Sequence, residues 1–303
     1  MATIKKWEVD TSMLLADGRK LGYRTCGSPD GLPLIFMHGS PGSRYVLSED
    51  DPLTDLPGVY LVTPERPGYG LSTPQPGRTL GDWAKDIEAL ANHLGLSEYW
   101  VAGISGGAPH ALACGHYSPD RVAGVFMMSS PAPTAIVTSN AGMSIGNRTG
   151  LWIGKHMPWL VKSAIGSYAA AFNKDAEAFM DRVAAQMCAP DQLLMQRQEL
   201  REAMIADMRE AYRQGSDAQF VDGQLTTSSP SWGFSPGSVA VAVFAWHGAL
   251  DTLVPLTAAE SLSVAMPAMH FTVVPDCGHL LTENQDVVAR IGQIMSLPTM
   301  PSV

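Results

Sequence analysis

Hydrophobic residues gather in short runs bounded by Gly, Pro and Asp, as is typical of buried parallel strands. These runs alternate with amphipathic segments such as residues 82–94, in which every third or fourth residue is apolar. The alternation predicts an α/β fold with a doubly wound, mostly parallel β-sheet. The pattern predicts strands at residues 20–26, 33–37, 59–63, 99–104, 121–128, 239–246 and 269–274, and helices at 82–94, 108–117, 257–265 and 283–295.

The alternation stops between about residues 131 and 236, where segments 151–165, 175–188 and 191–213 have a helical pattern. We therefore predict a helical cap, residues 132–236, inserted between two parts of one core, residues 1–131 and 237–303. Methionine fills irregular gaps in cores, and some of the cap's large apolar residues should also line a pocket if the cap covers the site. These residues are Met143, Met157, Met180, Met187, Met195, Met204, Met208, Trp152 and Trp159.

Composition narrows the classes of protein to consider. A hydrophobic content of 46% with 16% charged residues is typical of a folded globular protein, and a net charge of -9 disfavours nucleic acid and anionic membranes. The longest apolar run, residues 239–246, is too short to span a bilayer, and the N-terminus lacks a secretory signal, so we expect a cytoplasmic location. The four scattered cysteines have no metal-ligand or disulfide-framework spacing, which predicts reduced thiols. The sequence contains no His-Glu-x-x-His or similar ligand set, so we expect no catalytic metal and no cofactor.

The pentapeptide Gly103-Ile104-Ser105-Gly106-Gly107 lies where a predicted strand meets a predicted helix. A Gly-x-Ser-x-Gly at such a junction is typical of the nucleophile elbow of a serine hydrolase. A glycine-rich turn kept for packing or for binding a phosphate is the alternative, but the glycine and lysine pattern that would favour it is not present. A serine nucleophile needs a histidine base, and the base needs a carboxylate to orient it.

Five motifs occur in a fixed order along the chain: His38-Gly39-Ser40-Pro41-Gly42, Arg66-Pro67-Gly68-Tyr69-Gly70-Leu71-Ser72, the elbow at 103–107, Gly248-Ala249-Leu250-Asp251 with Val254-Pro255, and Gly278-His279. With these motifs in this order, the chain resembles capped esterases, lipases and peptidases of the α/β-hydrolase fold. The resemblance covers roughly two-thirds of its length. The resemblance implies Ser105 as nucleophile, His279 as general base and then acid, and Asp251 as the orienting carboxylate. It also implies that the N–H groups of Gly106 and Ser40 bind the oxyanion.

Two kinds of alternative stay open for the site. Asp276 is a rival for Asp251, but it lies three residues before His279 in the same loop, where a side-by-side approach to the imidazole is awkward. His110 and His247 fall in a predicted helix and strand and are expected to be structural, while His38 is expected to take part in the hydrogen bonding of its own loop.

The resulting hypothesis is a serine hydrolase that cleaves carboxylic esters of small to medium acyl groups. A prolyl-iminopeptidase-like aminopeptidase or amidase is the runner-up, although such peptidases typically carry Trp after the nucleophile, where this chain has Gly106. They also need cap carboxylates to hold a substrate amine; the candidates are Asp175, Glu177, Asp181 and Glu199, which a solvated helix face explains more simply.

A non-hydrolytic ligand-binding protein on the same scaffold is the third hypothesis. The expected partner is a small-molecule ester or amide, and a homodimer is compatible with the sequence although no residue argues for one.

Overall fold

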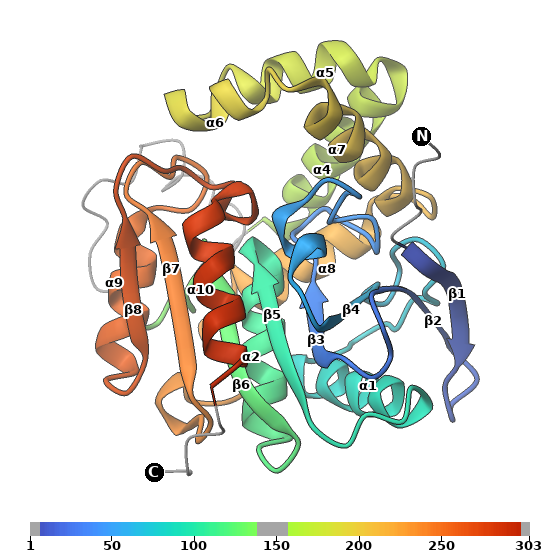
Figure 1. Cartoon of the computed structure of the whole chain (residues 1–303). Helices are drawn as coiled ribbons and strands as arrows, with labels where there is room; N and C mark the ends of the chain where they lie inside the picture. The colour runs from blue at the N-terminus through green and yellow to red at the C-terminus, as the bar shows by residue number, and fades with distance from the viewer. Residues whose placement is uncertain (1–6, 138–156, 298–303) are drawn as a thin grey trace, which may run out of the picture.

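The computed structural model describes residues 7–137 and 157–297, and the strands of this part of the chain form one eight-stranded sheet (Figure 1). The strands are β1 (Trp7–Leu14), β2 (Lys20–Cys26), β3 (Leu32–Met37), β4 (Val59–Pro64), β5 (Tyr99–Ile104), β6 (Val122–Met128), β7 (Val243–Gly248) and β8 (His270–Val274). Their order is β1-β2-β4-β3-β5-β6-β7-β8. The pairs β1–β2 and β2–β4 are antiparallel, and all other pairs are parallel. The doubly wound, mostly parallel sheet is therefore confirmed.

Helices cover both faces of the sheet, as the crossover connections of a parallel sheet require. The core helices are α1 (Leu80–His93), α2 (Ala108–Tyr117), α9 (Leu256–Ala265) and α10 (Gln285–Met295). Apolar residues of α1, α2 and α9 pack with Ile35 and Met37 on one face of the sheet. On the other face α10 packs with Leu34 and Phe36. Consecutive residues of β3 thus enter opposite cores, because side chains alternate along a strand.

In the described part of the chain between β6 and β7 there are five helices: α4 (Pro158–Lys174), α5 (Ala176–Ala184), α6 (Ala189–Leu194), α7 (Gln198–Ala211) and α8 (Asp217–Thr226). We call them the cap helices. Figure 1 shows them beyond the carboxyl ends of the parallel strands, where α/β proteins place their sites. They have an apolar core of their own, in which Phe172, Phe179 and Met195 are buried. The exact boundaries of the cap, at residues 131–132 and 236–237, stay a prediction.

The cap differs in detail from the pattern that predicted it. The segment 191–213 is two helices, because residues 195–197 form a turn between α6 and α7. Helix α8 and the edge strand β1 had no predicted counterpart, and β7 begins at Val243, later than the predicted residue 239, because residues 239–242 form a bend and irregular backbone. The predicted helix 151–165, as well as Met143 and Trp152, falls partly or wholly outside the described residues. Among the residues that the structure describes, no helix combines the length and apolar character needed to cross a membrane.

Candidate active site

Ser105 occupies a strained turn between β5 and α2. Its φ angle is 53°, in the left-handed region that L-residues rarely adopt. The turn is possible because its glycines let backbones approach: a Cβ atom on Gly103 would lie 2.5 Å from the carbonyl carbon of Gly107. Strain of this kind is typical of functional sites, and here it holds the serine at the carboxyl end of a central strand.

Two loops at the same end of the sheet bring Asp251 and His279 together. His279 Nδ1 donates to Asp251 Oδ2 over 2.8 Å, while Asp251 Oδ1 accepts from the N–H groups of Leu253 and Val254 at 2.8 and 2.9 Å. Burial alone would raise the pKa of Asp251, but the hydrogen bond from His279 and these backbone donors outweigh burial and lower it. The carboxylate is therefore ionised at neutral pH and holds the imidazole with Nδ1 toward it. Asp276 is exposed in the loop before His279 and makes no such contact in the described part of the chain.

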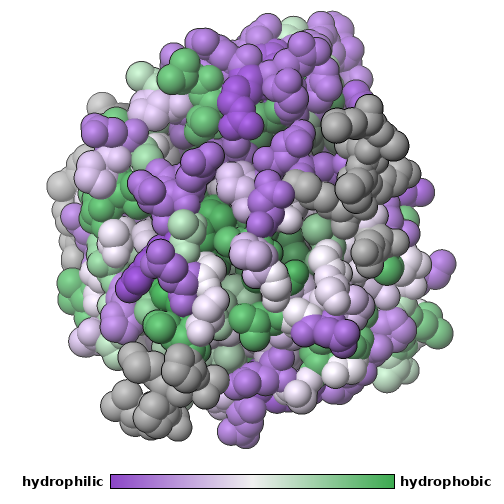
Figure 2. Space-filling model, in the orientation of Figure 1, coloured by the Kyte–Doolittle hydropathy of each residue, from purple (hydrophilic) through white to green (hydrophobic). Residues whose placement is uncertain are grey.

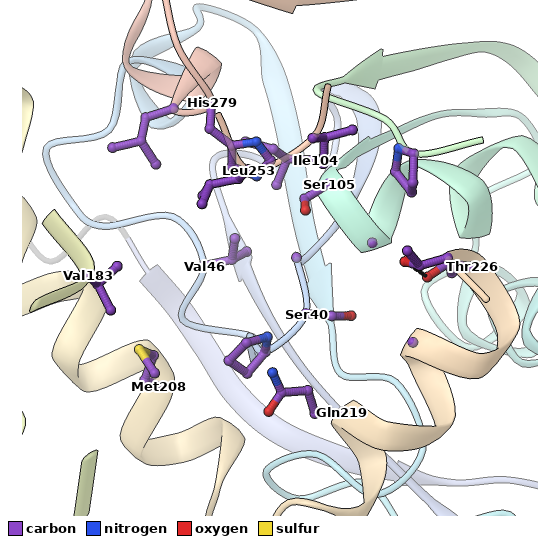
Figure 3. Close-up of a pocket in the computed structure, with 18 of the residues that line it drawn as sticks. Ser40, Val46, Ile104, Ser105, Val183, Met208, Gln219, Thr226, Leu253 and His279 are labelled. Atoms are coloured by element: carbon purple, nitrogen blue, oxygen red, sulfur yellow. Dashed lines mark hydrogen bonds between the residues drawn. The ribbon is translucent and has the colours of Figure 1, made fainter. Parts of the chain in front are cut away.

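Ser105 and His279 line the same cavity, and Figure 3 shows them on one side of it, opposite Val183 and Met208 of the cap helices. No hydrogen bond joins Ser105 to His279 among the described residues. Such contacts often tighten only when a substrate binds.

A cap residue anchors the loop that carries His279. Asp191 of α6 is buried, and its Oδ2 accepts from His279 N at 2.8 Å while its Oδ1 accepts from Leu280 N at 3.3 Å. Sequence reasoning placed Asp191 at the start of a helix and missed this role, because the two donors lie 88 and 89 residues away. The contact ties the position of the imidazole to the cap.

The two predicted oxyanion donors are neighbours. A Cβ atom on Gly106 would lie 2.6 Å from Ser40 Oγ and 3.5 Å from Ser40 N, so the backbones of these residues approach closely. Both residues line the cavity together with Ser105 and His279. Backbone N–H groups suit an oxyanion because they need no reorganisation when charge develops. A side chain at position 106 would therefore require Ser40 to move.

The cavity has a volume of about 1000 Å³ and mostly apolar walls. The apolar cap residues that line it include Val161, Ile165, Met180, Val183, Met187, Leu200, Ala203, Met204, Met208 and Phe220. Of the large apolar residues predicted for this role, Met195 packs inside the cap instead and Trp159 is exposed to solvent. Within the described ranges, no group of three or more His, Cys, Asp and Glu side chains is arranged to hold a metal ion.

The four cap carboxylates considered from the sequence lie away from the cavity. Asp175, Glu177, Asp181 and Glu199 are all exposed, and Arg201 pairs with two of them, Glu177 and Asp181. Figure 2 shows the corresponding hydrophilic surface on the outside of the cap helices. A solvated helix face therefore describes these residues better than an amine site.

Asp207 of α7 is the cap carboxylate that sequence reasoning missed. It lines the cavity, and its Oδ1 accepts from Ser43 N at 2.8 Å and from Ser43 Oγ at 2.6 Å. Within residues 7–137 and 157–297, no hydrogen bond reaches its Oδ2. Burial, only partly offset by the Ser43 donors, raises the pKa of Asp207 to about 7. The helical pattern is defined by the spacing of apolar residues. Asp207 lies beside these positions, so the pattern gave no sign of its role.

We expect Asp207→Asn to change the pH dependence of stability. A raised pKa means that the folded state keeps a proton that the unfolded state loses above about pH 4, so this contribution to stability is lost as pH rises through 7. Asparagine keeps the Ser43 bonds and does not titrate. We therefore compare the Tm of the variant with that of the native protein at each pH. The difference, variant minus native, should be roughly 3 °C larger at pH 8.5 than at pH 5. Calorimetry across this range checks the expectation, with exposed Glu199→Gln on the same helix as the control; parallel Tm curves would contradict it.

The other histidines near the site are buried. His247 Nε2 donates to Val254 O at 3.0 Å and lies 3.5 Å from Asp251 Oδ2. His110 Nδ1 donates to Gly106 O at 2.8 Å, and His38 Nδ1 to Gly39 O at 2.8 Å. Burial lowers the pKa of all three side chains, that of His110 to about 3, so they are neutral at pH 7. These contacts fit the structural roles predicted for them.

Comparison with known proteins places this geometry in a family. The family model of the alpha/beta hydrolase fold matches residues 33–285, and the chain belongs to that family. A proline iminopeptidase of Xylella fastidiosa is 25% identical over 307 residues, which cover 93% of this chain and 94% of that protein. A proline iminopeptidase of Arabidopsis thaliana is 34% identical over 119 residues, 38% of this chain, and the match spans about a third (31%) of that relative.

Solved structures support the same fold. An esterase from Thermogutta terrifontis superposes with a TM-score of 0.64 at 21% identity, covering 95% of this chain and 96% of that one. A hydrolase from Pseudomonas aeruginosa gives a TM-score of 0.71 at 15% identity, covering 97% of this chain and all (100%) of the other. At these identities the likeness establishes the fold alone, so the chemistry has to be argued from the site.

Proposed function

We propose that the chain is a serine hydrolase that cleaves carboxylic esters of small to medium acyl groups. The observation that carries the proposal is the hydrogen bond between His279 and Asp251 at the edge of an apolar cavity that Ser105 also lines. An imidazole oriented by a carboxylate, on the same cavity as a serine in a strained turn, is the arrangement that activates a hydroxyl group.

The proposed reaction has two halves. Ser105 Oγ attacks the ester carbonyl carbon while His279 Nε2 takes its proton, and the N–H groups of Gly106 and Ser40 donate to the oxyanion. The C–O bond to the alcohol then breaks, and His279 returns the proton to the departing oxygen. In the second half His279 deprotonates a water molecule that attacks the acyl carbon. The bond from this carbon to Ser105 Oγ then breaks and His279 returns the proton to Oγ, which releases the acid and restores Ser105.

Asp207 favours a second candidate, the hydrolysis of substrates that carry an amine. The described residues that line the cavity include no Lys or Arg but three carboxylates, Asp51, Asp207 and Glu283. Glu283 is paired with Arg197 at 2.6 Å, and burial raises the pKa of Asp51 well above its usual range. A protonated amine near Asp207 would favour the ionised form of this carboxyl group and pair with it, as recognition of an aminoacyl ester or amide requires. The close packing of Ser40 against Gly106 argues for the ester, because peptidases of the resembled type typically carry a Trp after the nucleophile, and Ser40 would have to move to admit one here.

A comparison of unactivated substrates tests the two candidates. We expect methyl esters of short acyl chains to be hydrolysed with a kcat/KM at least about 100-fold above the matching amides and prolyl amides, since amides are the harder bonds to cleave. Aminoacyl substrates that are cleaved better than neutral esters would contradict the ester proposal. In that case Asp207→Asn should raise KM for the aminoacyl substrates about 10-fold and leave neutral esters unchanged, a loss expected for a charge-assisted hydrogen bond.

A further inference from the structure

Asp222 of helix α8 lies at the centre of a fully buried polar cluster between the cap and the core. Both of its carboxylate oxygens are occupied: Oδ2 accepts from Arg66 Nε at 2.8 Å, Ser40 Oγ at 2.7 Å and Tyr69 OH at 2.9 Å, and Oδ1 accepts from Arg78. The side chains of Asp222, Arg66 and Arg78 have at most 1% of their surface exposed. The proposed mechanism uses none of these three residues.

Arg66 connects Asp222 to the loop that supplies one oxyanion donor. Its guanidinium donates to the carbonyl oxygen of His38, to that of Gly39 at 2.6 Å and to Ser40 Oγ at 3.0 Å. A guanidinium offers five donors in a rigid plane, so it can fix several acceptors at once when its own orientation is fixed. Asp222 fixes that orientation through Arg66 Nε and also binds Ser40 Oγ directly. The backbone of residues 38–40 is thus held from the cap.

The second oxyanion donor is connected to the same carboxylate. His110 Nδ1 donates to Gly106 O, and its Nε2 lies 3.5 Å from Arg78 Nη1 and 3.8 Å from Asp222 Oδ1. Arg78 in turn donates to Asp222. Ser40 also packs directly against Gly106. Asp222 therefore lies where the supports of both N–H groups meet.

We propose that Asp222 is a positioning residue that sets the geometry of the oxyanion hole from the cap. The inference rests on the proposed function, because it assumes that Ser40 and Gly106 bind an oxyanion. Its consequence is that the site is complete only when helix α8 is docked on the core. The cap then does more than enclose the substrate, since it holds the groups that stabilise the transition state.

The charge of the cluster makes the role testable. Asp222→Asn removes one negative charge from between two arginines, which leaves the surroundings of the oxyanion hole more positive. On electrostatic grounds alone this change would favour an oxyanion. A fall in reactivity therefore reports lost geometry and not lost charge.

The experiment measures how fast a fluorophosphonate reacts with Ser105, since attack at phosphorus uses the oxyanion hole whatever substrate the enzyme prefers. We expect Asp222→Asn to lower the second-order labelling rate constant about 10- to 100-fold, somewhat less than the loss of a whole oxyanion donor. KI for a neutral carboxylic amide that fills the cavity should stay within about 2-fold, because ground-state binding does not need the hole. The assay temperature is one at which circular dichroism shows each variant folded.

Asp86→Asn is the matched control. Asp86 is a buried aspartate of α1 that pairs with the two terminal guanidinium nitrogens of Arg19, at 2.8 and 2.7 Å, on a part of the core that does not line the cavity. It should lose stability as Asp222→Asn does and keep the native labelling rate. Equal labelling rates in the two variants would overturn the proposal. Native protein that is not labelled at all would instead refute the serine chemistry of the proposed function.

Arg66→Lys provides an independent test if Asp222→Asn does not fold. Lysine keeps the positive charge opposite Asp222, but all its N–H donors are on one nitrogen atom. It therefore cannot hold the carbonyl groups of residues 38 and 39 together. The proposal expects the same fall in labelling rate with an unchanged KI. A native labelling rate in folded Arg66→Lys would overturn it.

Discussion

Ser105→Ala should lower ester turnover by at least about 10⁵-fold and abolish labelling by a fluorophosphonate. The reason is that no other group in the proposed mechanism forms the covalent intermediate, and removing the nucleophile of a serine triad removes nearly all the rate that the triad supplies. The cavity and the oxyanion donors remain, so binding of neutral ligands should be unchanged. Mass spectrometry of the labelled peptide and steady-state kinetics with a short-chain ester measure both effects.

Ser105→Gly provides a second variant that separates chemistry from stability. It should be as inactive as Ser105→Ala, yet its Tm should be higher, because a φ angle of 53° costs an L-residue roughly 1–2 kcal/mol and glycine almost nothing. Labelling that persists in either variant would assign the reactive hydroxyl to another residue. A protein that is labelled at Ser105 but releases no product would support the ligand-binding hypothesis.

The core of the fold could be predicted because its signals are local. Buried strands such as Tyr99–Ile104 are short apolar runs, and helix α1 shows its apolar face every third or fourth residue. The edge strand β1 escaped prediction because it is antiparallel and partly exposed, and its residues do not form an apolar run. A resemblance of motifs then supplied Ser105, Asp251 and His279, and the structure places Asp251 in hydrogen-bond contact with His279.

The cap could be predicted only as a region, and the reason is physical. Helix α8 turns Asp222 into the interior, so its buried face is partly polar and does not repeat like an apolar stripe. The partners of Asp222 lie 144 to 182 residues away, and those of Asp191 lie 88 and 89 residues away. Hydrogen bonds over such separations leave no local pattern. For this reason the carboxylates that attach the cap to the loops of the candidate site emerged only from the structure.

Asp251→Asn should lower kcat for an ester by about 10⁴-fold while leaving KM nearly unchanged. The contacts of Asp251 explain why an almost isosteric change is so costly. The amide oxygen of the introduced asparagine would keep the N–H donors of Leu253 and Val254, which turns the amide NH₂ toward His279 Nδ1. The imidazole must then accept at Nδ1 and carry its proton on Nε2, so it cannot take the proton of Ser105. Steady-state kinetics with a short-chain ester measure the loss.

Asp276→Asn is the matched control for this prediction. Asp276 lies three residues before His279, is exposed and has a φ angle of 55°, a conformation that asparagine tolerates as well as aspartate. Its kcat should stay within about 2-fold of the native value, as expected for an exposed residue outside the site. A large loss in Asp276→Asn together with an active Asp251→Asn would transfer the role of the orienting carboxylate to Asp276. Two active variants would show that the imidazole needs no carboxylate to act as the base.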